Sequence, residues 1–156
     1  MEKKVSEKTG TGEADMYLDT SVAAKLYFNE PDSPRVSGIL AGTRPALCSS
    51  ELLISELRSA ACRKLREKLV TRAQFKEAIN TFMAHDKTGS WHLYPATRSV
   101  LCLSAELTEK LSGVCGLRTL DAVHLATCVE YALSPLFTTD KVMLAAAKAL
   151  KIEILA

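Results

Sequence analysis

Two aspartates follow short runs that are typical of buried strands. Asp19 comes directly after the apolar residues 16–18, and Asp140 comes directly after residues 136–139, which begin Leu-Phe. In both places a strand is expected to pass into a helix. Because the carboxyl ends of parallel strands meet at the same edge of a sheet, we expect these two carboxylates to lie near each other.

Two further acids lie on expected helices, in positions where a fully solvated carboxylate is unusual. Glu56 has two leucines one turn before it and Ser59 and Ala60 one turn after it, so it lies on the small, apolar side of its helix. Asp121 lies in the first turn of another helix, one turn before His124. The four acids are therefore candidates for one common site.

Each acid also has a structural alternative. The two aspartates that follow strands are favourable N-cap residues, the third aspartate suits a helix N-terminus, and the glutamate is in reach of Arg58. Together, however, buried carboxylates repel one another and their pKa values rise. A divalent cation removes this penalty, and Mg²⁺ and Mn²⁺ prefer oxygen ligands. If Asp19 binds such an ion, we expect Thr20 or Ser21 to cap the helix and leave the carboxylate free.

Short buried runs alternate with helical patterns along the chain. Strands are expected at residues 16–18, 45–48, 91–94, 136–138 and 152–155. Helices are expected at 20–28, before 40, at 51–68, around 75–82 after a Thr71 cap, at 97–111, at 120–132 after a Thr119 cap, and at 140–150. This order predicts an α/β fold with three α/β/α layers around a mainly parallel, five-stranded sheet. Residues 1–14 are polar and are interpreted as a disordered arm before one domain at 15–156.

The composition is that of an ordinary globular protein. The chain has 156 residues, of which 47% are hydrophobic and 24% charged, and its net charge of +2 does not identify a partner. Five cysteines occur without a C-x-x-C pair, which argues against a disulfide framework and against a zinc site. No apolar run approaches the ~20 residues of a membrane helix, and no secretory signal is recognisable. We expect a soluble, cytoplasmic protein that does not enter a membrane.

The four acids fall within motifs of a known family. Residues 18–21 (Leu-Asp-Thr-Ser), 118–126 (Arg-Thr-Leu-Asp-Ala-Val-His-Leu-Ala) and 137–140 (Phe-Thr-Thr-Asp), with Glu56 between them, resemble the PIN domain. The similarity is greatest to the VapC-type toxins of toxin–antitoxin pairs and covers nearly all of residues 16–156. The resemblance implies that the cofactor is Mg²⁺ or Mn²⁺, held by catalytic carboxylates: Asp19, Glu56, Asp121 and Asp140.

The resemblance also implies an activity and partners. It indicates a metal-dependent endoribonuclease that acts on RNA, is inhibited by a cognate antitoxin protein and forms a homodimer. Ser21 matches the family's hydroxyl beside the first acid, and Arg118, three residues before Asp121, is expected to contact substrate phosphate. The alternative is a catalytically inactive PIN-like module that binds RNA or protein.

Two other enzyme classes fit the residues poorly. A phosphotransferase of the haloacid-dehalogenase type needs a second aspartate two residues after the first, where this chain has Ser21. A dinucleotide-binding oxidoreductase needs a Gly-x-Gly-x-x-Gly motif after a strand, and the sequence has none.

Positive charge is concentrated between Arg58 and Lys76, where seven bases and one acid give a net charge of +6. This stretch either follows a phosphate backbone or is a solvated helix face. His124 is expected to steady Asp121 rather than to act as a general acid. Trp91 and the nearby tyrosine at 94 are expected in a core strand rather than in a base-stacking platform.

Overall fold

The computed structural model describes residues 15–43 and 46–155, so the predicted arm at residues 1–14 lies outside the described residues. A five-stranded parallel sheet forms the centre of this part of the chain, in the strand order β3-β2-β1-β4-β5. The predicted parallel α/β fold is confirmed. The strands span Asp15–Leu18 (β1), Ala46–Ser50 (β2), Trp91–Tyr94 (β3), Leu136–Phe137 (β4) and Ile154–Leu155 (β5).

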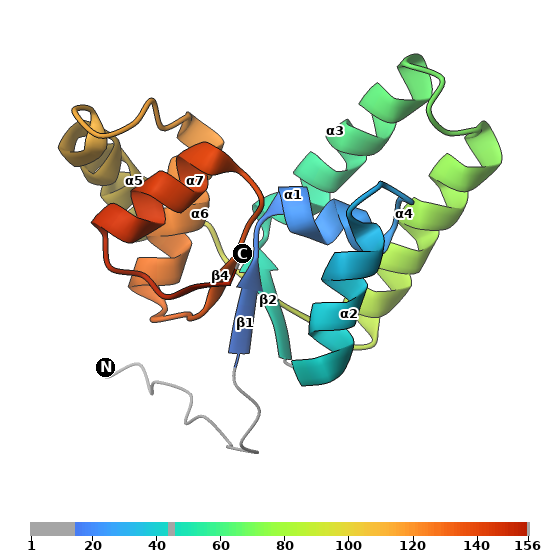
Figure 1. The fold of residues 1–156 in the computed structure, drawn as a ribbon, viewed down its shortest axis with the longest axis horizontal. Helices are drawn as coiled ribbons and strands as arrows, with labels where there is room; N and C mark the ends of the chain where they lie inside the picture. Colours follow the sequence, from blue (N-terminus) through green and yellow to red (C-terminus); the bar gives the residue numbers. More distant parts are fainter. Residues whose placement is uncertain (1–14, 44–45, 156) are drawn as a thin grey trace.

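Helices connect these strands and cover both faces of the sheet (Figure 1). The expected helix after β1 is divided into an α-helical turn and a 3-10 turn. The helical segments span Thr20–Ala23 (α1), Ala24–Leu26 (η1), Ser33–Thr43 (α2), Leu52–Arg66 (α3), Arg72–Lys87 (α4), Arg98–Leu111 (α5), Thr119–Glu130 (α6) and Lys141–Ala149 (α7). No helix in the described ranges is both long and apolar enough to cross a membrane.

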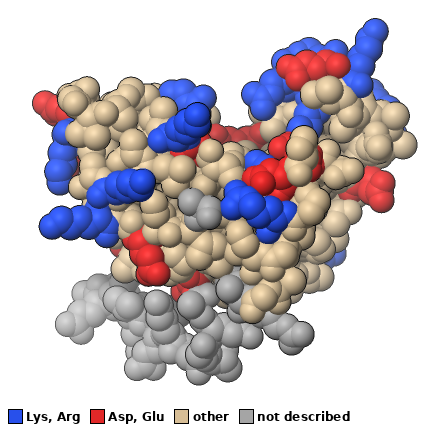
Figure 2. All heavy atoms as spheres, in the orientation of Figure 1, with Lys and Arg blue, Asp and Glu red and all other residues tan. Residues whose placement is uncertain are grey.

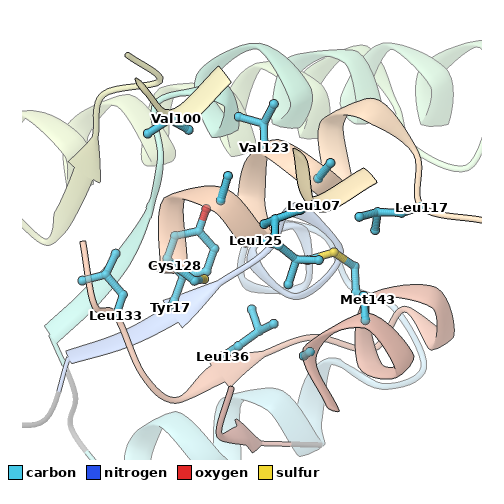
Figure 3. Close-up of a cluster of buried hydrophobic side chains, with 14 of the residues drawn as sticks. Tyr17, Val100, Leu107, Leu117, Val123, Leu125, Cys128, Leu133, Leu136 and Met143 are labelled. Carbon is cyan, nitrogen blue, oxygen red and sulfur yellow. The ribbon is translucent and has the colours of Figure 1, made fainter. Parts of the chain in front are cut away.

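Strand alternation divides the core into two clusters. Consecutive side chains of a strand point to opposite faces, so Tyr17 and Leu18 of β1 enter different layers. Leu18 packs with side chains of α1, α3 and α4, whereas Tyr17 packs with side chains of α5, α6 and α7. Figure 3 shows Tyr17 among the labelled side chains of this second cluster. The sheet is therefore buried on both faces, as predicted for three layers.

The order of the strands changes direction at β1. From β1 the chain proceeds outward to β2 and β3, and then returns to the other side of β1 to form β4 and β5. β1 therefore pairs with β2 on one side and with β4 on the other, in parallel in both cases. Ligands of open α/β sheets bind at the carboxyl ends of the strands where the order reverses. Here that place lies between the ends of β1 and β4.

The start of α6 differs from the prediction. Arg118, not Thr119, is the N-cap residue, and no side-chain hydrogen bond caps the helix. Thr119 belongs to the first turn of α6. The cap of α4 is as predicted, because Thr71 accepts a hydrogen bond from the Gln74 amide and Gln74 bonds back to the Thr71 amide.

Candidate active site

A cleft of about 610 Å³ lies at the reversal point of the sheet, between the helices of the two layers. All four predicted acids line it: Asp19, Glu56, Asp121 and Asp140. Ser21, Arg118 and His124 line it as well. Figure 2 shows a notch on this face, with acidic side chains in its floor and basic side chains near its edges. The four acids thus come from four different elements to one place.

Asp19 is buried, with 4% of its surface exposed, at the junction of β1 and α1. Its Oδ1 accepts hydrogen bonds from the Val22 amide at 3.0 Å and from the Ser21 hydroxyl at 2.7 Å, and its Oδ2 accepts one from the Thr138 hydroxyl at 2.5 Å. Burial raises the pKa of Asp19, and the bonds from Thr138 and Ser21 oppose that rise. The expectation that Thr20 or Ser21 caps α1 is wrong. Asp19 is itself the N-cap, because it is the extended residue that precedes the helix.

Asp140 stands in the equivalent place after β4. Its Oδ1 caps α7 by accepting hydrogen bonds from the amides of Val142 and Met143, at 2.8 and 3.0 Å. Its own amide donates to the Thr138 hydroxyl at 3.1 Å, and that hydroxyl donates to Asp19. Thr138 therefore connects the two strand-end acids. It was not identified from the sequence, where it reads as one more residue of a buried strand.

Glu56 reaches the cleft from α3 and is held by two side chains. Its Oε2 accepts hydrogen bonds from the Thr20 hydroxyl at 2.6 Å and from Nε2 of His124 at 2.7 Å. Burial raises the pKa of Glu56, but the contacts with His124 and Thr20 outweigh it and the net direction is downward. The prediction that His124 steadies Asp121 is not what the structure shows. The ring bonds instead to Glu56 and, through Nδ1, to the hydroxyl of Tyr17 at 2.6 Å.

Arg118 forms ion pairs with two of the acids that line the cleft. Its Nε lies 2.7 Å from Oδ2 of Asp121, and its Nη2 lies 3.4 Å from Oδ2 of Asp140. The side chain is 71% exposed, so these are surface ion pairs. The hydrogen bond to Asp121 is the main cause that raises the pKa of Arg118. Arg118 is thus beside the acids, and in this arrangement it neutralises them.

The chemistry of the four acids suits a hard divalent cation. Each is fixed through one carboxylate oxygen or through both, and each carboxylate oxygen accepts about two hydrogen bonds. Glu56 Oε1 and Asp121 Oδ1 accept no hydrogen bond from any described residue. All-oxygen donor sets are those that Mg²⁺ and Mn²⁺ prefer. In the arrangement described for residues 15–43 and 46–155, no three His, Cys, Asp or Glu side chains lie close enough to share one ion.

Basic side chains of the layer that contains α3 also line the cleft. Arg63 and Lys64 belong to the basic stretch predicted from the sequence, and Lys25 of η1 joins them. Glu30 bridges Lys25 at 3.7 Å and Lys64 at 2.7 Å. Lys25 also donates to the backbone oxygen of Ser21 and to the hydroxyl of Thr139, so it ties the first helical turn to the segment before α7.

The fold and the cleft define a three-layer α/β protein with a carboxylate-lined site at the reversal point of its sheet. The model of the PIN domain family matches residues 16–149, and the chain belongs to this family. Comparison with curated proteins finds no match.

Solved structures of toxin–antitoxin proteins have a similar fold. A toxin–antitoxin complex from Klebsiella pneumoniae is 16% identical, with 90% of this chain and 96% of that chain covered and a TM-score of 0.63. VapC20 of Mycobacterium tuberculosis, described as a sarcin–ricin loop cleaving toxin, is 15% identical over 84% of this chain and 94% of its own, with a TM-score of 0.68. FitAcB from Neisseria gonorrhoeae is 18% identical, with 90% of this chain and 96% of that chain covered and a TM-score of 0.63. At these identities the likeness shows a shared fold.

Proposed function

We propose that this chain is a divalent-metal-dependent endoribonuclease that hydrolyses RNA phosphodiesters, and that it is the toxin of a type II toxin–antitoxin pair. The observation that carries the proposal is the position of four acids from separate elements around one cleft. Membership of the PIN domain family supports it, as does the fold shared with VapC20, which is described as a sarcin–ricin loop cleaving toxin.

Because no three of the described acids lie close enough to share one ion, at least part of their contact with Mg²⁺ or Mn²⁺ would be through water. The acids that would hold the ion in this way are Asp19, Glu56, Asp121 and Asp140. When bound, such an ion stabilises negative charge on a phosphoryl oxygen and lowers the pKa of a bound water. The hydrogen bonds to Oε2 of Glu56 keep its carboxylate ionised and leave Oε1 available to orient the attacking water. Thr138 and Ser21 hold the carboxylate of Asp19 in one orientation.

The basic residues of the cleft would bind the RNA backbone. Arg63 and Lys64 line the same cleft as the acids, where they offset the repulsion between carboxylates and phosphates. Binding that depends on such contacts weakens as salt concentration rises, because phosphate contacts release counterions. RNA affinity is therefore expected to fall with salt even where the acids are unchanged.

The partners follow from the resemblance and from the cleft. An antitoxin protein would insert a basic side chain among the acids and prevent metal and RNA from binding. Arg118 makes a contact of this type within the chain, with Asp121 and Asp140. The family resemblance favours a homodimer, and a cytoplasmic location is part of the same proposal.

A second candidate function is a non-catalytic PIN-like module that binds RNA or protein. The contacts of Arg118 favour it, because a guanidinium neutralises Asp121 and Asp140 without an ion. The two candidates differ in one measurable property, which is cleavage of RNA.

The decisive experiment incubates the purified protein with a broad panel of RNAs, with Mg²⁺ or Mn²⁺ and with a chelator. Asp19→Asn is the test variant, and Glu109→Gln, which removes one exposed carboxylate from α5, is the control of matched charge change. The nuclease proposal predicts metal-dependent cleavage by the wild type and the control and loss of cleavage in Asp19→Asn. Cleavage that survives chelation or is unchanged in that variant contradicts the mechanism. Binding of RNA without cleavage supports the second candidate.

A further inference from the structure

A chain of buried hydrogen bonds leads from β1 to the cleft. Tyr17, which is 0% exposed, bonds through its hydroxyl to Nδ1 of His124, which is 2% exposed. Nε2 of His124 bonds to Oε2 of Glu56. Three elements are connected in this way, because the tyrosine belongs to β1, the histidine to α6 and the glutamate to α3.

We propose that Tyr17 and His124 are positioning residues for Glu56, which fix its carboxylate so that Oε1 faces the cleft. The proposal rests on the proposed nuclease function and adds to the four acids two residues that act through Glu56. Neither residue needs to touch RNA, because each acts through Glu56.

The polarity of the hydrogen bonds supports this role. An ionised carboxylate only accepts hydrogen bonds, so Nε2 of His124 carries the hydrogen that is shared with Glu56. In a neutral imidazole the other nitrogen is then an acceptor, and the hydroxyl of Tyr17 donates to it. The carboxylate of Glu56 thus sets the tautomer, and the hydrogen bond from Tyr17 fixes the orientation of the ring. The two rings also meet edge to face, with centroids 5.8 Å apart.

The hydrogen bond from His124 restricts the position of the Glu56 carboxylate. A glutamate side chain has several rotatable bonds, and 18% of this one is exposed. Without the imidazole, its carboxylate keeps the hydroxyl of Thr20 as its anchor. With it, two donors from different elements hold the same oxygen, Oε2. Groups that orient a ligand or a water in this way set the geometry on which a reaction depends.

Tyr17 and His124 are polar at positions where apolar side chains would be sufficient for packing. A buried hydroxyl and a buried imidazole destabilise the fold unless they are hydrogen-bonded, and apolar side chains of similar size would fill the same space. In the described part of the chain, no buried polar side-chain atom lacks a partner. The polar atoms of Tyr17 and His124 are thus satisfied by a chain of bonds that ends on a carboxylate of the cleft.

Three variants separate positioning from packing. Tyr17→Phe removes only the hydroxyl and keeps the ring, His124→Leu removes both ring nitrogens, and His124→Gln retains an N–H donor that reaches Glu56. Cleavage rates and Mn²⁺ affinity, the latter by titration calorimetry without RNA, are measured on full-length proteins. Thermal melts establish that each variant is folded at the assay temperature.

The expected effects are graded. Loss of residues that orient metal ligands lowers activity or metal affinity by about 10–100-fold, so His124→Leu is expected within that range and Tyr17→Phe near its lower end. His124→Gln recovers most of the loss, although its thermal stability is lowered as in the leucine variant. A packing role alone predicts instead that activity follows thermal stability across the three variants.

A double variant gives the sharpest test. If His124 acts through Glu56, adding His124→Leu to Glu56→Gln causes no further loss of Mn²⁺ affinity or cleavage beyond that of Glu56→Gln alone. A further tenfold loss overturns the proposal, as does wild-type behaviour of both Tyr17→Phe and His124→Leu. If the wild type cleaves RNA and these variants cleave it equally well, the proposed nuclease function is supported and the positioning role is wrong. A wild-type protein that neither cleaves RNA nor binds Mn²⁺ overturns both.

Discussion

Replacement of Arg118 by alanine should strengthen the binding of a divalent cation to the cleft. The guanidinium lies 2.7 Å from Oδ2 of Asp121 and 3.4 Å from Oδ2 of Asp140, so a cation that binds these two oxygen atoms must displace it. Exposed ion pairs contribute about 0.2–1 kcal/mol each, and the two contacts of this 71% exposed side chain are therefore worth about 1 kcal/mol together. That amount corresponds to about fivefold tighter Mn²⁺ binding.

Titration calorimetry of Mn²⁺ into wild type and Arg118→Ala, at low ionic strength, measures this difference directly. Arg98→Ala is the matched control, because Arg98 is an exposed arginine at the start of α5 and does not line the cleft. The gain in affinity should shrink in high salt, since exposed charges are screened. Unchanged or weaker Mn²⁺ binding in Arg118→Ala would refute the competition between arginine and cation.

Three further predictions concern stability and reactivity. Thr138→Val removes a buried hydroxyl that bonds to Asp19 and to the amide of the α7 cap residue. This substitution should lower the free energy of unfolding by about 2 kcal/mol, whereas Thr138→Ser keeps the hydroxyl and should retain the wild-type value. Urea denaturation measures both variants. Because burial raises the pKa of Asp19 above its ordinary value of 3.8, its contribution to stability is present below pH 3.8 and is lost as the pH rises through the higher folded-state pKa. The stability of the wild type relative to Asp19→Asn should therefore fall as the pH rises above 3.8, and a difference that does not vary with pH would contradict this. A thiol reagent should modify the exposed Cys62 and Cys102 first in the native protein and the buried cysteines only after unfolding, which mass spectrometry can test.

Local signals were sufficient for much of the fold. The strand at Trp91–Tyr94 was predicted with its observed bounds, because the turn before it and the proline after it limit its length. The Thr71 cap was predicted because a hydroxyl residue precedes the helical pattern, and the structure adds the reciprocal bond from Gln74. The five-stranded parallel sheet followed from the alternation of such short buried runs with helices.

Details that depend on the third dimension could not be predicted in the same way. Helical spacing placed His124 beside Asp121, but the imidazole bonds to Glu56, a contact made across 68 positions of sequence by side chains that extend from α6 and α3 into the same cleft. The cap of α1 was misassigned because the choice between three adjacent polar residues depends on which one has extended backbone angles, and that residue is Asp19. Spacing therefore identified the acids, while tertiary contacts determine what holds them.

The long sequence separation between the parts of the cleft determines when it can form during synthesis. Thr138, which bonds to Asp19, lies 119 residues after it, and β1 needs β4 as its neighbour on one side. Domains fold as their residues emerge from the ribosome, and non-local pairing waits for the later partner. When the ribosome has synthesised α3 but not yet α6 and α7, the nascent chain contains Asp19 and Glu56 but lacks Asp121 and Asp140. The proposed nuclease activity therefore requires synthesis to have passed β4 and the residues that follow it, because the acids at the two ends of the chain form one cleft.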